Sequence, residues 1–394
     1  MHEFKIEDTI LLVDTSRSMM RKDFLPNRLF IALQAIKNFI QTKFAIDPKD
    51  RISIITFGDV PKRLSQLSYD QHKLINSLNK VQISGKGTLH QAIALSLQII
   101  IQEMRKIGGK IQRIFIITDD RLAIEQTKLD KIVNIAKGLG VYIDICQLGK
   151  PKDRNKNLLK SISQTTDGEY GYFNNTKAVI NAGREFASKK AIKKRTEFYS
   201  PDKKEKIPPL IGEIALSLRR PTLMEIRSMM SKEGELEANK CAICHSIKAP
   251  LTNADFYTEG RYCPNCERPV HLSCAAMWAK GSEFKENIFR CPFCFFLIEL
   301  PKSAVKKIKN LDKDSQKIKI IEEIEIKKSK MIEIHKDDIN QINASCCYCH
   351  NIFLGDFKVF KCENCGSYYH EPCLKKIFTE LKACRFCGAK IILD

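Results

Sequence analysis

The chemistry of this 394-residue chain is concentrated in its second half, where cysteines recur in pairs separated by two residues. The first pair is Cys241 and Cys244, and two histidines, His271 and His370, each stand three positions before a further cysteine. Thiolate and imidazole are the ligands that Zn²⁺ prefers, and four of them close a tetrahedral site. The pattern therefore predicts structural metal binding, and no catalytic side chain stands out.

These ligands form two sets of eight in the same order: four cysteines, one histidine and three cysteines. Each set makes two sites, from adjacent or from interleaved pairs, so we expect four Zn²⁺ per chain. Such small modules have little core, and the metal supplies most of their folding energy. Cys347 is left over and is an alternative to Cys346. The first set is Cys241, Cys244, Cys263, Cys266, His271, Cys274, Cys291 and Cys294, and the second is Cys346, Cys349, Cys362, Cys365, His370, Cys373, Cys384 and Cys387.

The expected cellular compartment favours metal-bound cysteines over disulfides. The N-terminal "MHEFKIEDTILLVD" is acidic and enters a strand pattern at once, unlike a signal peptide. No apolar run approaches the length of a membrane span. We therefore expect the protein in the cytosol, or in the nucleus of a eukaryotic cell, with no membrane partner. Disulfides are rare in these compartments, so 16 cysteines point to metal.

The net charge of +20 is a second feature of composition. A basic surface favours polyanions such as nucleic acid, although lysine used for solubility explains it more simply. The densest cluster, "KKAIKKR" at residues 189–195, has no interleaved aromatic residues. It is thus a weak signal for nucleic-acid binding.

The first half alternates strand and helix patterns. Apolar runs at residues 9–14, 51–57, 113–119 and 141–149 predict strands buried on both faces. Residues 27–44 and 88–106 show the three- and four-residue apolar spacing of helices. Residues 130–140 form a third helical stretch, which ends on a glycine. This alternation predicts an α/β fold with a doubly wound, parallel-type sheet.

Oxygen ligands stand where three of these strands end or a helix begins. Parallel sheets place ligands at the carboxyl ends of their strands. Carboxylates and hydroxyls suit Mg²⁺, so we expect one Mg²⁺ at this edge. The alternatives are that the first residues only cap the following turn, or that the fold is used without metal. The predicted ligands are Asp14, Ser16, Ser18, Thr88 and Asp119.

This set of five residues resembles the metal-ion-dependent adhesion site of the von Willebrand factor A domain. The resemblance covers roughly residues 5–190 and rests on Asp14-x-Ser16-x-Ser18, a distant Thr88 and a distant Asp119. It implies a binding role, in which the metal keeps a free position for the carboxylate of a protein partner.

The cysteine sets resemble RING and PHD fingers, which implies a cross-braced arrangement of interleaved pairs. In the first set Ile243, Trp278 and Pro292 match the groove with which RING domains bind a ubiquitin-conjugating enzyme. Phe295 stands where many active RING domains carry Arg. Phe289, two residues before the seventh ligand, keeps the PHD alternative open.

The second set lacks these groove residues and has Tyr348, Ile377 and Arg385 instead. With "CENCGSYYHEPC" it resembles the C-terminal zinc finger of the TFIIH subunit that begins with an A domain. We divide the chain into an A domain (1–195), a linker (196–239), a RING-like finger (240–300), a charged spacer (301–343) and a second finger (344–394). The spacer is compatible with a strand pair or a helix.

Two functions follow from these resemblances. The first is a RING-type ubiquitin-protein ligase or ligase adaptor, whose A domain selects a substrate or a complex subunit. Such a ligase acts by proximity and orientation, without a covalent intermediate. The alternative is a non-enzymatic scaffold in a TFIIH-like transcription or DNA-repair complex.

Overall fold

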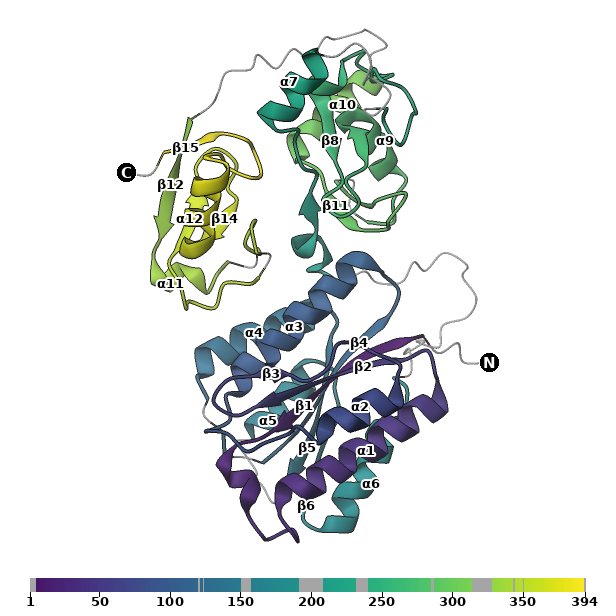
Figure 1. Ribbon diagram of the computed structural model, residues 1–394, viewed down its shortest axis with the longest axis vertical. Coiled ribbons are helices and arrows are strands. Elements are labelled where there is room, and N and C mark those ends of the chain that lie inside the picture. Colours follow the sequence, from purple (N-terminus) through teal and green to yellow (C-terminus); the bar gives the residue numbers. More distant parts are fainter. Residues whose placement is uncertain are drawn as a thin grey trace. The chain divides into compact units, whose positions relative to one another are not determined.

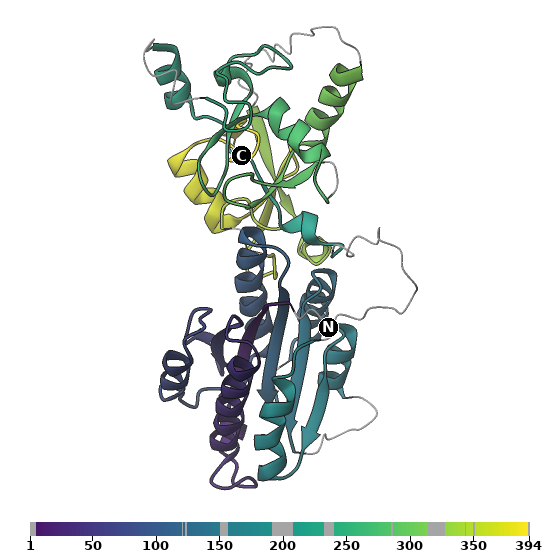
Figure 2. The same ribbon diagram turned by 90° about the vertical axis from the view of Figure 1, so that its right-hand side faces the viewer.

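The computed structural model describes residues 5–119, 121–122, 124–149, 157–190, 208–231, 240–284, 287–313, 328–342, 344–349 and 351–392. These fall into two compact units, one comprising Met1–Glu103 with Gly108–Leu210 and the other Met104–Ile107 with Ile211–Asp394. Figures 1 and 2 show the elements of each unit. None of the described helices combines the length and apolar character that crossing a bilayer requires.

The first unit is built on a six-stranded sheet in the order β3-β2-β1-β4-β5-β6. Every neighbouring pair is parallel except β2 and β3, so the predicted α/β sheet is confirmed. The central strand β1 places Asp14 beside Phe57 at the end of β2. The strands are β1 (Glu7–Asp14), β2 (Arg51–Phe57), β3 (Lys62–Arg63), β4 (Ile111–Thr118), β5 (Tyr142–Leu148) and β6 (Tyr170–Phe173).

Helices cover both faces of this sheet (Figure 1). On one face α1, α2 and α6 share a core with the strands, in which Phe39 stacks on Phe115 at 4.9 Å between ring centroids. Asparagine caps begin α1 and α6, since Asn27 and Asn175 each accept an N–H from the third residue on. The helices are α1 (Arg28–Ile46), α2 (Gln71–Leu78), α3 (Leu89–Lys106), α4 (Gln126–Gly138), α5 (Leu158–Thr165) and α6 (Thr176–Phe186), with a short 3₁₀ turn η1 (Arg17–Met20).

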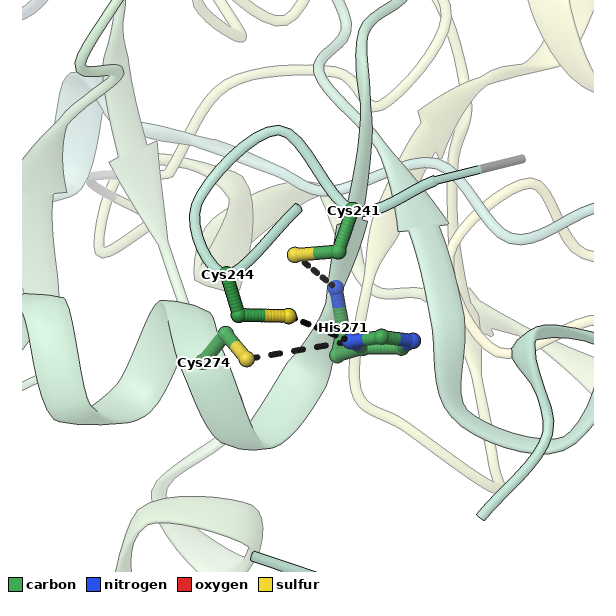
Figure 3. A group of neighbouring side chains, drawn as sticks. All are labelled: Cys241, Cys244, His271 and Cys274. Atoms are coloured by element: carbon green, nitrogen blue, oxygen red, sulfur yellow. Dashed lines mark hydrogen bonds between the residues drawn. The ribbon is translucent and has the colours of Figure 1, made fainter. Parts of the chain in front are cut away.

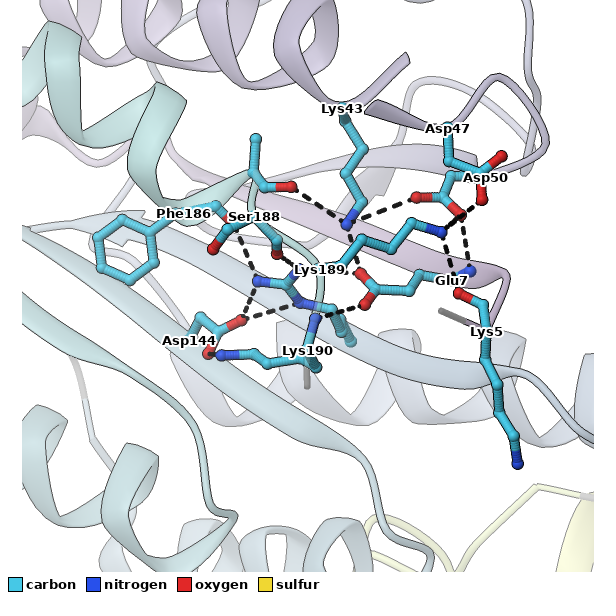
Figure 4. Close-up of polar contacts among 12 residues, drawn as sticks. Lys5, Glu7, Lys43, Asp47, Asp50, Asp144, Phe186, Ser188, Lys189 and Lys190 are labelled. Carbon is cyan, nitrogen blue, oxygen red and sulfur yellow. Dashed lines mark hydrogen bonds and ion pairs between the residues drawn. The ribbon is translucent and has the colours of Figure 1, made fainter. Parts of the chain in front are cut away.

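A buried network of charged side chains lies at the amino ends of these strands (Figure 4). The Glu7 carboxylate contacts the Lys43 ammonium, and its Oε2 lies 2.9 Å from Nη1 of Arg113. Asp144 joins Arg113 and Lys190, each at 2.7 Å. Buried charges are tolerated only when they are paired and hydrogen-bonded, as these are. The network ties the segment after α6 to the sheet.

The network also bears on the basic cluster at residues 189–195. Lys189 pairs with Asp47 and Asp50 at 2.6 and 2.8 Å, and Lys190 pairs with Asp144 and with Glu169. Both lysines are therefore engaged inside the first unit, while residues 191–195 lie outside the described part of the chain. Nucleic-acid binding by this cluster stays a weakly supported prediction.

The first cysteine-rich module contains two small sheets, one of which includes a strand from the predicted linker. Leu216 and Ser217 of β7 pair in parallel with β11, which pairs antiparallel with β10. Its elements are η2 (Ile211–Ile214), β7 (Leu216–Ser217), α7 (Leu223–Ser231), α8 (Phe256–Glu259), β8 (Gly260–Tyr262), β9 (Pro269–His271), α9 (Leu272–Lys280), β10 (Ile288–Arg290), β11 (Leu297–Glu299) and α10 (Lys302–Lys313).

The second module is similar and takes its added strand from the predicted spacer. Strand β12 pairs antiparallel with β13 and parallel with β15. The spacer thus contains both a helix, α10, and a strand, β12, while residues 314–327 lie outside the described residues. The domain boundaries stay predictions. The elements are β12 (Lys328–Ile334), α11 (Lys336–Ile339), β13 (Val359–Cys362), β14 (Tyr368–His370), α12 (Glu371–Glu380) and β15 (Lys390–Ile392).

Candidate metal centres and adhesion-site edge

The Cys-x-x-Cys pairs form a recurring tight turn. In the first, the carbonyl of Cys241 accepts the N–H of His245, and the N–H of Cys241 donates to the carbonyl of Ser246 at 3.0 Å. The residue after the second cysteine has a positive φ, 59° for His245 and 57° for Phe295. This turn directs both thiols of a pair to one side. The corresponding N–H to carbonyl distances are 2.7 Å for His245, 3.0 Å for Glu267 and Phe295, and 2.8 Å for Gly366 and Gly388.

The sixteen predicted ligands come together in four groups of four, each from interleaved pairs. Within a group all ligand atoms lie within 4.8 Å of one another, and every group mixes buried and half-buried residues. Each module thus has one group with a histidine and one with cysteines alone. The groups are Cys241, Cys244, His271 and Cys274; Cys263, Cys266, Cys291 and Cys294; Cys346, Cys349, His370 and Cys373; and Cys362, Cys365, Cys384 and Cys387.

The spacing inside the groups matches a tetrahedral zinc site. With Zn–S bonds of about 2.3 Å, the sulfurs of a regular tetrahedron stand about 3.8 Å apart. In the second group Sγ of Cys263 lies 3.6 Å from that of Cys294, and Sγ of Cys266 lies 3.9 Å from that of Cys291. All of these cysteines are free thiols rather than disulfides. The geometry is therefore compatible with one Zn²⁺ in each group.

The histidine of the first group is oriented for coordination (Figure 3). Its Nδ1 faces Sγ of Cys244 at 3.4 Å and Sγ of Cys274 at 3.7 Å. Its Nε2 lies 2.9 Å from the carbonyl oxygen of Ile247, which can accept only a hydrogen bond. That contact assigns the proton to Nε2 and leaves the Nδ1 lone pair for a metal, the usual arrangement of a ligating histidine.

The positions of Cys346 and Cys347 differ in the second module. Cys346 belongs to the third group, whereas Cys347 does not. The backbone N–H of Cys347 donates to the carbonyl of Tyr368 at 2.9 Å, and burial raises the pKa of its thiol to about 12. Cys347 packs against the core of this module, outside the group of ligands.

The predicted groove residues lie on three segments of the first module. Ile243 and Pro292 are half-buried within the Cys241 and Cys291 turns. Trp278 is on α9, the helix that also holds Cys274, and its side chain is 49% exposed. In the second module the equivalent of Trp278 is Ile377, which is fully buried. Two equivalent positions of different burial show that the modules present different surfaces.

The remaining groove positions differ as well. In the second module the Arg385 guanidinium lies 5.6 Å from the Tyr348 ring centroid, and the Tyr348 hydroxyl donates to Glu380 at 3.2 Å. In the first module Phe289 is buried in the core, whereas Phe295 is 61% exposed.

The predicted Mg²⁺ ligands meet at the carboxyl edge of the first unit's sheet. Oδ1 of Asp14 accepts the N–H of Ser16 at 2.7 Å, and the hydroxyls of Ser16 and Ser18 lie 2.9 Å apart. Thr118 Oγ1 is 2.6 Å from Oδ2 of Asp14 and 3.0 Å from the backbone oxygen of Asp119. Burial raises the pKa of Asp14 to about 6.

Thr88 takes part less directly. Its hydroxyl donates to the carbonyls of Gly58 and Asp59, each at 3.2 Å. Its neighbour Gly87 packs against the loop, since a Cβ there would lie 3.3 Å from the Cβ of Ser16. The five predicted residues thus share one edge, with Thr88 turned towards the end of β2.

One residue at this edge was missed by the sequence analysis. Arg28 begins α1, and its Nη1 lies 2.6 Å from Oδ2 of Asp119. Its Nε donates to Asp23 at 2.8 Å. A cation in the first turn of a helix is disfavoured by the helix dipole. Because Arg28 directly follows the capping residue Asn27, the sequence contains one local sign that its side chain pairs with a specific carboxylate.

Comparison with known proteins agrees with this fold. Residues 9–121 match the von Willebrand factor type A domain. The N-terminal unit therefore contains an A domain, and all five predicted oxygen ligands lie in the matched range. The chain is 24% identical over 165 residues to 26S proteasome non-ATPase regulatory subunit 4 of Caenorhabditis elegans, which covers 42% of this chain and 47% of that protein.

Two further relatives are yeast proteins named as 26S proteasome regulatory subunits. RPN10 of Saccharomyces cerevisiae is 26% identical over 155 residues (39% of this chain, 57% of that one), and rpn10 of Schizosaccharomyces pombe is 23% identical over 146 residues (37% and 59%). The chain spans about half the length of the curated relatives it matches. Among solved structures, the SpRpn10 VWA domain aligns with a TM-score of 0.40 and 19% identity, over 45% of this chain and 95% of that one.

Proposed function

We propose that this protein is a RING-type ubiquitin-protein ligase or a ligase adaptor. Its first zinc module binds a ubiquitin-conjugating enzyme, and its A domain binds a protein partner that is a substrate or a complex subunit. The observation that carries the proposal is the exposure of Trp278 on α9. Large exposed aromatic side chains on a rigid support are the anchors that dominate protein interfaces.

The four clusters bind one Zn²⁺ each, in two cross-braced fingers. Support comes from the interleaved grouping of the ligands and from sulfur separations close to a tetrahedral edge. In the first finger the metals connect the segments that carry the groove. Cys274 fixes α9 and hence Trp278, while Cys244 and Cys291 fix the turns of Ile243 and Pro292. Zinc would thus preorganise the binding surface rather than take part in chemistry.

The reaction needs no nucleophile from this chain. A thioester-linked ubiquitin on the conjugating enzyme would be held near a lysine of a partner bound to the A domain. Bringing two reactants together in this way supplies a large rate acceleration by itself. Ile243, Trp278 and Pro292 bind the enzyme, and no residue of the chain is assigned a catalytic role.

The A domain connects the proposal to protein degradation. Its relatives are named as regulatory subunits of the 26S proteasome, which supports a role in the ubiquitin system. We place its partner site at the carboxyl edge of the sheet, around Asp14 and Asp119. Free thiols in zinc clusters fit a reducing compartment, the cytosol or the nucleus.

A non-enzymatic scaffold in a TFIIH-like complex is the second candidate. It is favoured by Phe295, which stands in the first finger where many ligases carry an arginine. It is also favoured by the second module, in which Ile377 is buried and Arg385 lies over Tyr348. Such a scaffold needs zinc for its fold but no conjugating enzyme.

Reconstituted ubiquitin transfer separates the two. Zinc-loaded full-length protein is incubated with ubiquitin, its activating enzyme and a panel of conjugating enzymes. A ligase produces conjugates with at least one enzyme, and the signal disappears when the protein is omitted. If no enzyme in the panel binds the protein or is discharged faster in its presence, the ligase proposal fails and the scaffold remains.

A further inference from the structure

Arg28 turns its guanidinium into the first unit instead of towards solvent, although it stands in the first turn of a helix. Its side chain is only 7% exposed, and that of Asp119 is fully buried. The position is unfavourable for a cation because the helix dipole is positive at this end. Its side chain is retained by two carboxylates, those of Asp23 and Asp119.

The surroundings of the guanidinium form a socket that fits it. Its carbon lies 5.9 Å from the ring centroid of Phe24. Gly149, after β5, has a φ of +81°, and a Cβ there would lie 3.5 Å from Nη2 of Arg28. Two carboxylates and an aromatic ring are groups that stabilise a guanidinium.

The carboxylate oxygens that a metal would use are already engaged. Oδ2 of Asp119 accepts Arg28 Nη1 at 2.6 Å, and its Oδ1 accepts the N–H of Arg121 at 2.9 Å. The two oxygens of Asp14 accept the N–H of Ser16 and the hydroxyl of Thr118. Each carboxylate oxygen of the two acidic ligands thus accepts a hydrogen bond from the protein itself.

Such a donor set does not fit Mg²⁺ well. Mg²⁺ requires near-octahedral oxygen coordination at short distances, and proteins usually hold it through the charge of one or two carboxylates while it keeps several of its waters. At Asp119 that charge is balanced by a guanidinium in contact with the same carboxylate. The five-residue motif is complete in the sequence, but Arg28, which is not part of that motif, changes which cation the site can hold.

We propose that Arg28 is the resident cation of this A domain and that the adhesion-site edge works without a divalent metal. The Mg²⁺ implied by the resemblance is then not a cofactor of this chain. A partner is recognised by the protein surface at this edge, since there is no metal to offer an open coordination position to its carboxylate. The inference concerns the A domain alone and does not depend on ligase activity.

Manganese titration tests the proposal directly. Mn²⁺ binds most oxygen sites more tightly than Mg²⁺ does, and its free form is counted by electron paramagnetic resonance. We expect zinc-loaded full-length protein to bind no more Mn²⁺ in the millimolar range than the matched variant Asp14→Asn. One Mn²⁺ bound by the wild type and lost in Asp14→Asn would overturn the proposal.

The variant Arg28→Gln tests whether removing the guanidinium creates a metal site. It frees Asp119, so we expect one new Mn²⁺ site, at least about tenfold tighter than any in the wild type, which disappears in the double variant Arg28→Gln, Asp14→Asn. Mn²⁺ should raise the melting temperature of Arg28→Gln but not that of the wild type. A folded Arg28→Gln that gains no site contradicts the assignment of Arg28. If this variant does not fold, the comparison of wild type with Asp14→Asn still decides.

Discussion

The hydroxyl of Ser329 lies 3.2 Å from Sγ of Cys362 and accepts the N–H of Asn364 at 3.2 Å. Ser329 is on β12, in the segment that separates the two cysteine sets, and it is buried. It therefore lies directly behind the fourth group of ligands, in contact with a ligand sulfur and with the backbone of the turn that presents it. Such partners fix ligand orientation in metal sites.

Replacing Ser329 by Ala should weaken the second module without removing a ligand. We expect a loss of about 1 kcal/mol in its unfolding free energy, typical of one hydrogen bond, and faster zinc release to a chelator. The control is Lys328→Ala, an exposed neighbour on the same strand. Equal zinc release rates for the two variants would show that the Ser329 contact is unimportant.

The ligand groups could be predicted from the sequence because their information is local. A Cys-x-x-Cys turn is closed by its own backbone, as in the bond from His245 to Cys241. The interleaved grouping came only from resemblance, and Cys346 was separated from Cys347 by the fold alone. The parallel sheet was equally predictable, since β1 and β4 each contain a run of four apolar residues, ILLV and IFII.

The strands β7 and β12 and the ion pair of Arg28 with Asp119 could not be predicted from the sequence. β7 has two residues, too few for any period, and it is a strand only because β11 offers it a partner. β12, with the sequence KSKMIEI, has no strict alternation that would distinguish a strand from a helix, and its pairing depends on distant residues of β13 and β15. Arg28 and Asp119 are 91 positions apart.

Zinc content is the most direct check of the clusters. Four groups predict four zinc ions per chain by elemental analysis of protein purified without chelator. His271→Ala should remove the metal of the first group, giving about three. Strong chelation should unfold both modules and leave the A domain folded, as seen in its separate thermal transition. A wild-type value near two would mean that one module is not a two-metal finger.

The buried network around Glu7 predicts a defined acid sensitivity. Burial alone would raise the pKa of Glu7, but the charges of Arg113 and Lys43 hold it below its ordinary value. The ionised carboxylate therefore stabilises the fold above its unfolded pKa of about 4.3. That contribution is lost as the pH falls through the lower pKa of the folded state.

Glu7→Gln should accordingly cost about 3–5 kcal/mol at neutral pH, because Arg113 and Lys43 are left in a buried site without their shared anion. Its stability should also vary less with pH below about 4. The control is Glu169→Gln, which removes a half-exposed partner of Lys190 and should cost about 0–1 kcal/mol. Similar losses in the two variants would mean that burial does not strengthen the network.

The turn residue after each cysteine pair gives a prediction about strain. Phe295 has a φ of 57°, a conformation that costs an L residue about 1–2 kcal/mol. Phe295→Gly should therefore raise the free energy of unfolding of the first module. Part of this gain is offset because glycine has more conformational freedom in the unfolded chain. Gly388→Ala, at the same turn position with a φ of 73°, should lower that of the second module. Thermal unfolding of both variants measures the signs, and a destabilised Phe295→Gly would show that its side chain packs.

Trp278 and Ile377 occupy equivalent positions, and their different burial predicts opposite defects. Trp278→Ala should retain its zinc and melting temperature but weaken binding of a conjugating enzyme by about 2 kcal/mol or more, the range of interface anchors. Ile377→Ala should leave that binding unchanged, yet cost the second module about 2–5 kcal/mol as a buried truncation.

Met277→Ala is the control for α9, since Met277 is also exposed, at 41%, and lies outside the predicted groove. Calorimetric binding and zinc content on the three variants separate an interface from a core defect. A stable, zinc-loaded Trp278→Ala protein that still binds the enzyme and supports ubiquitin transfer as well as Met277→Ala does would exclude the groove.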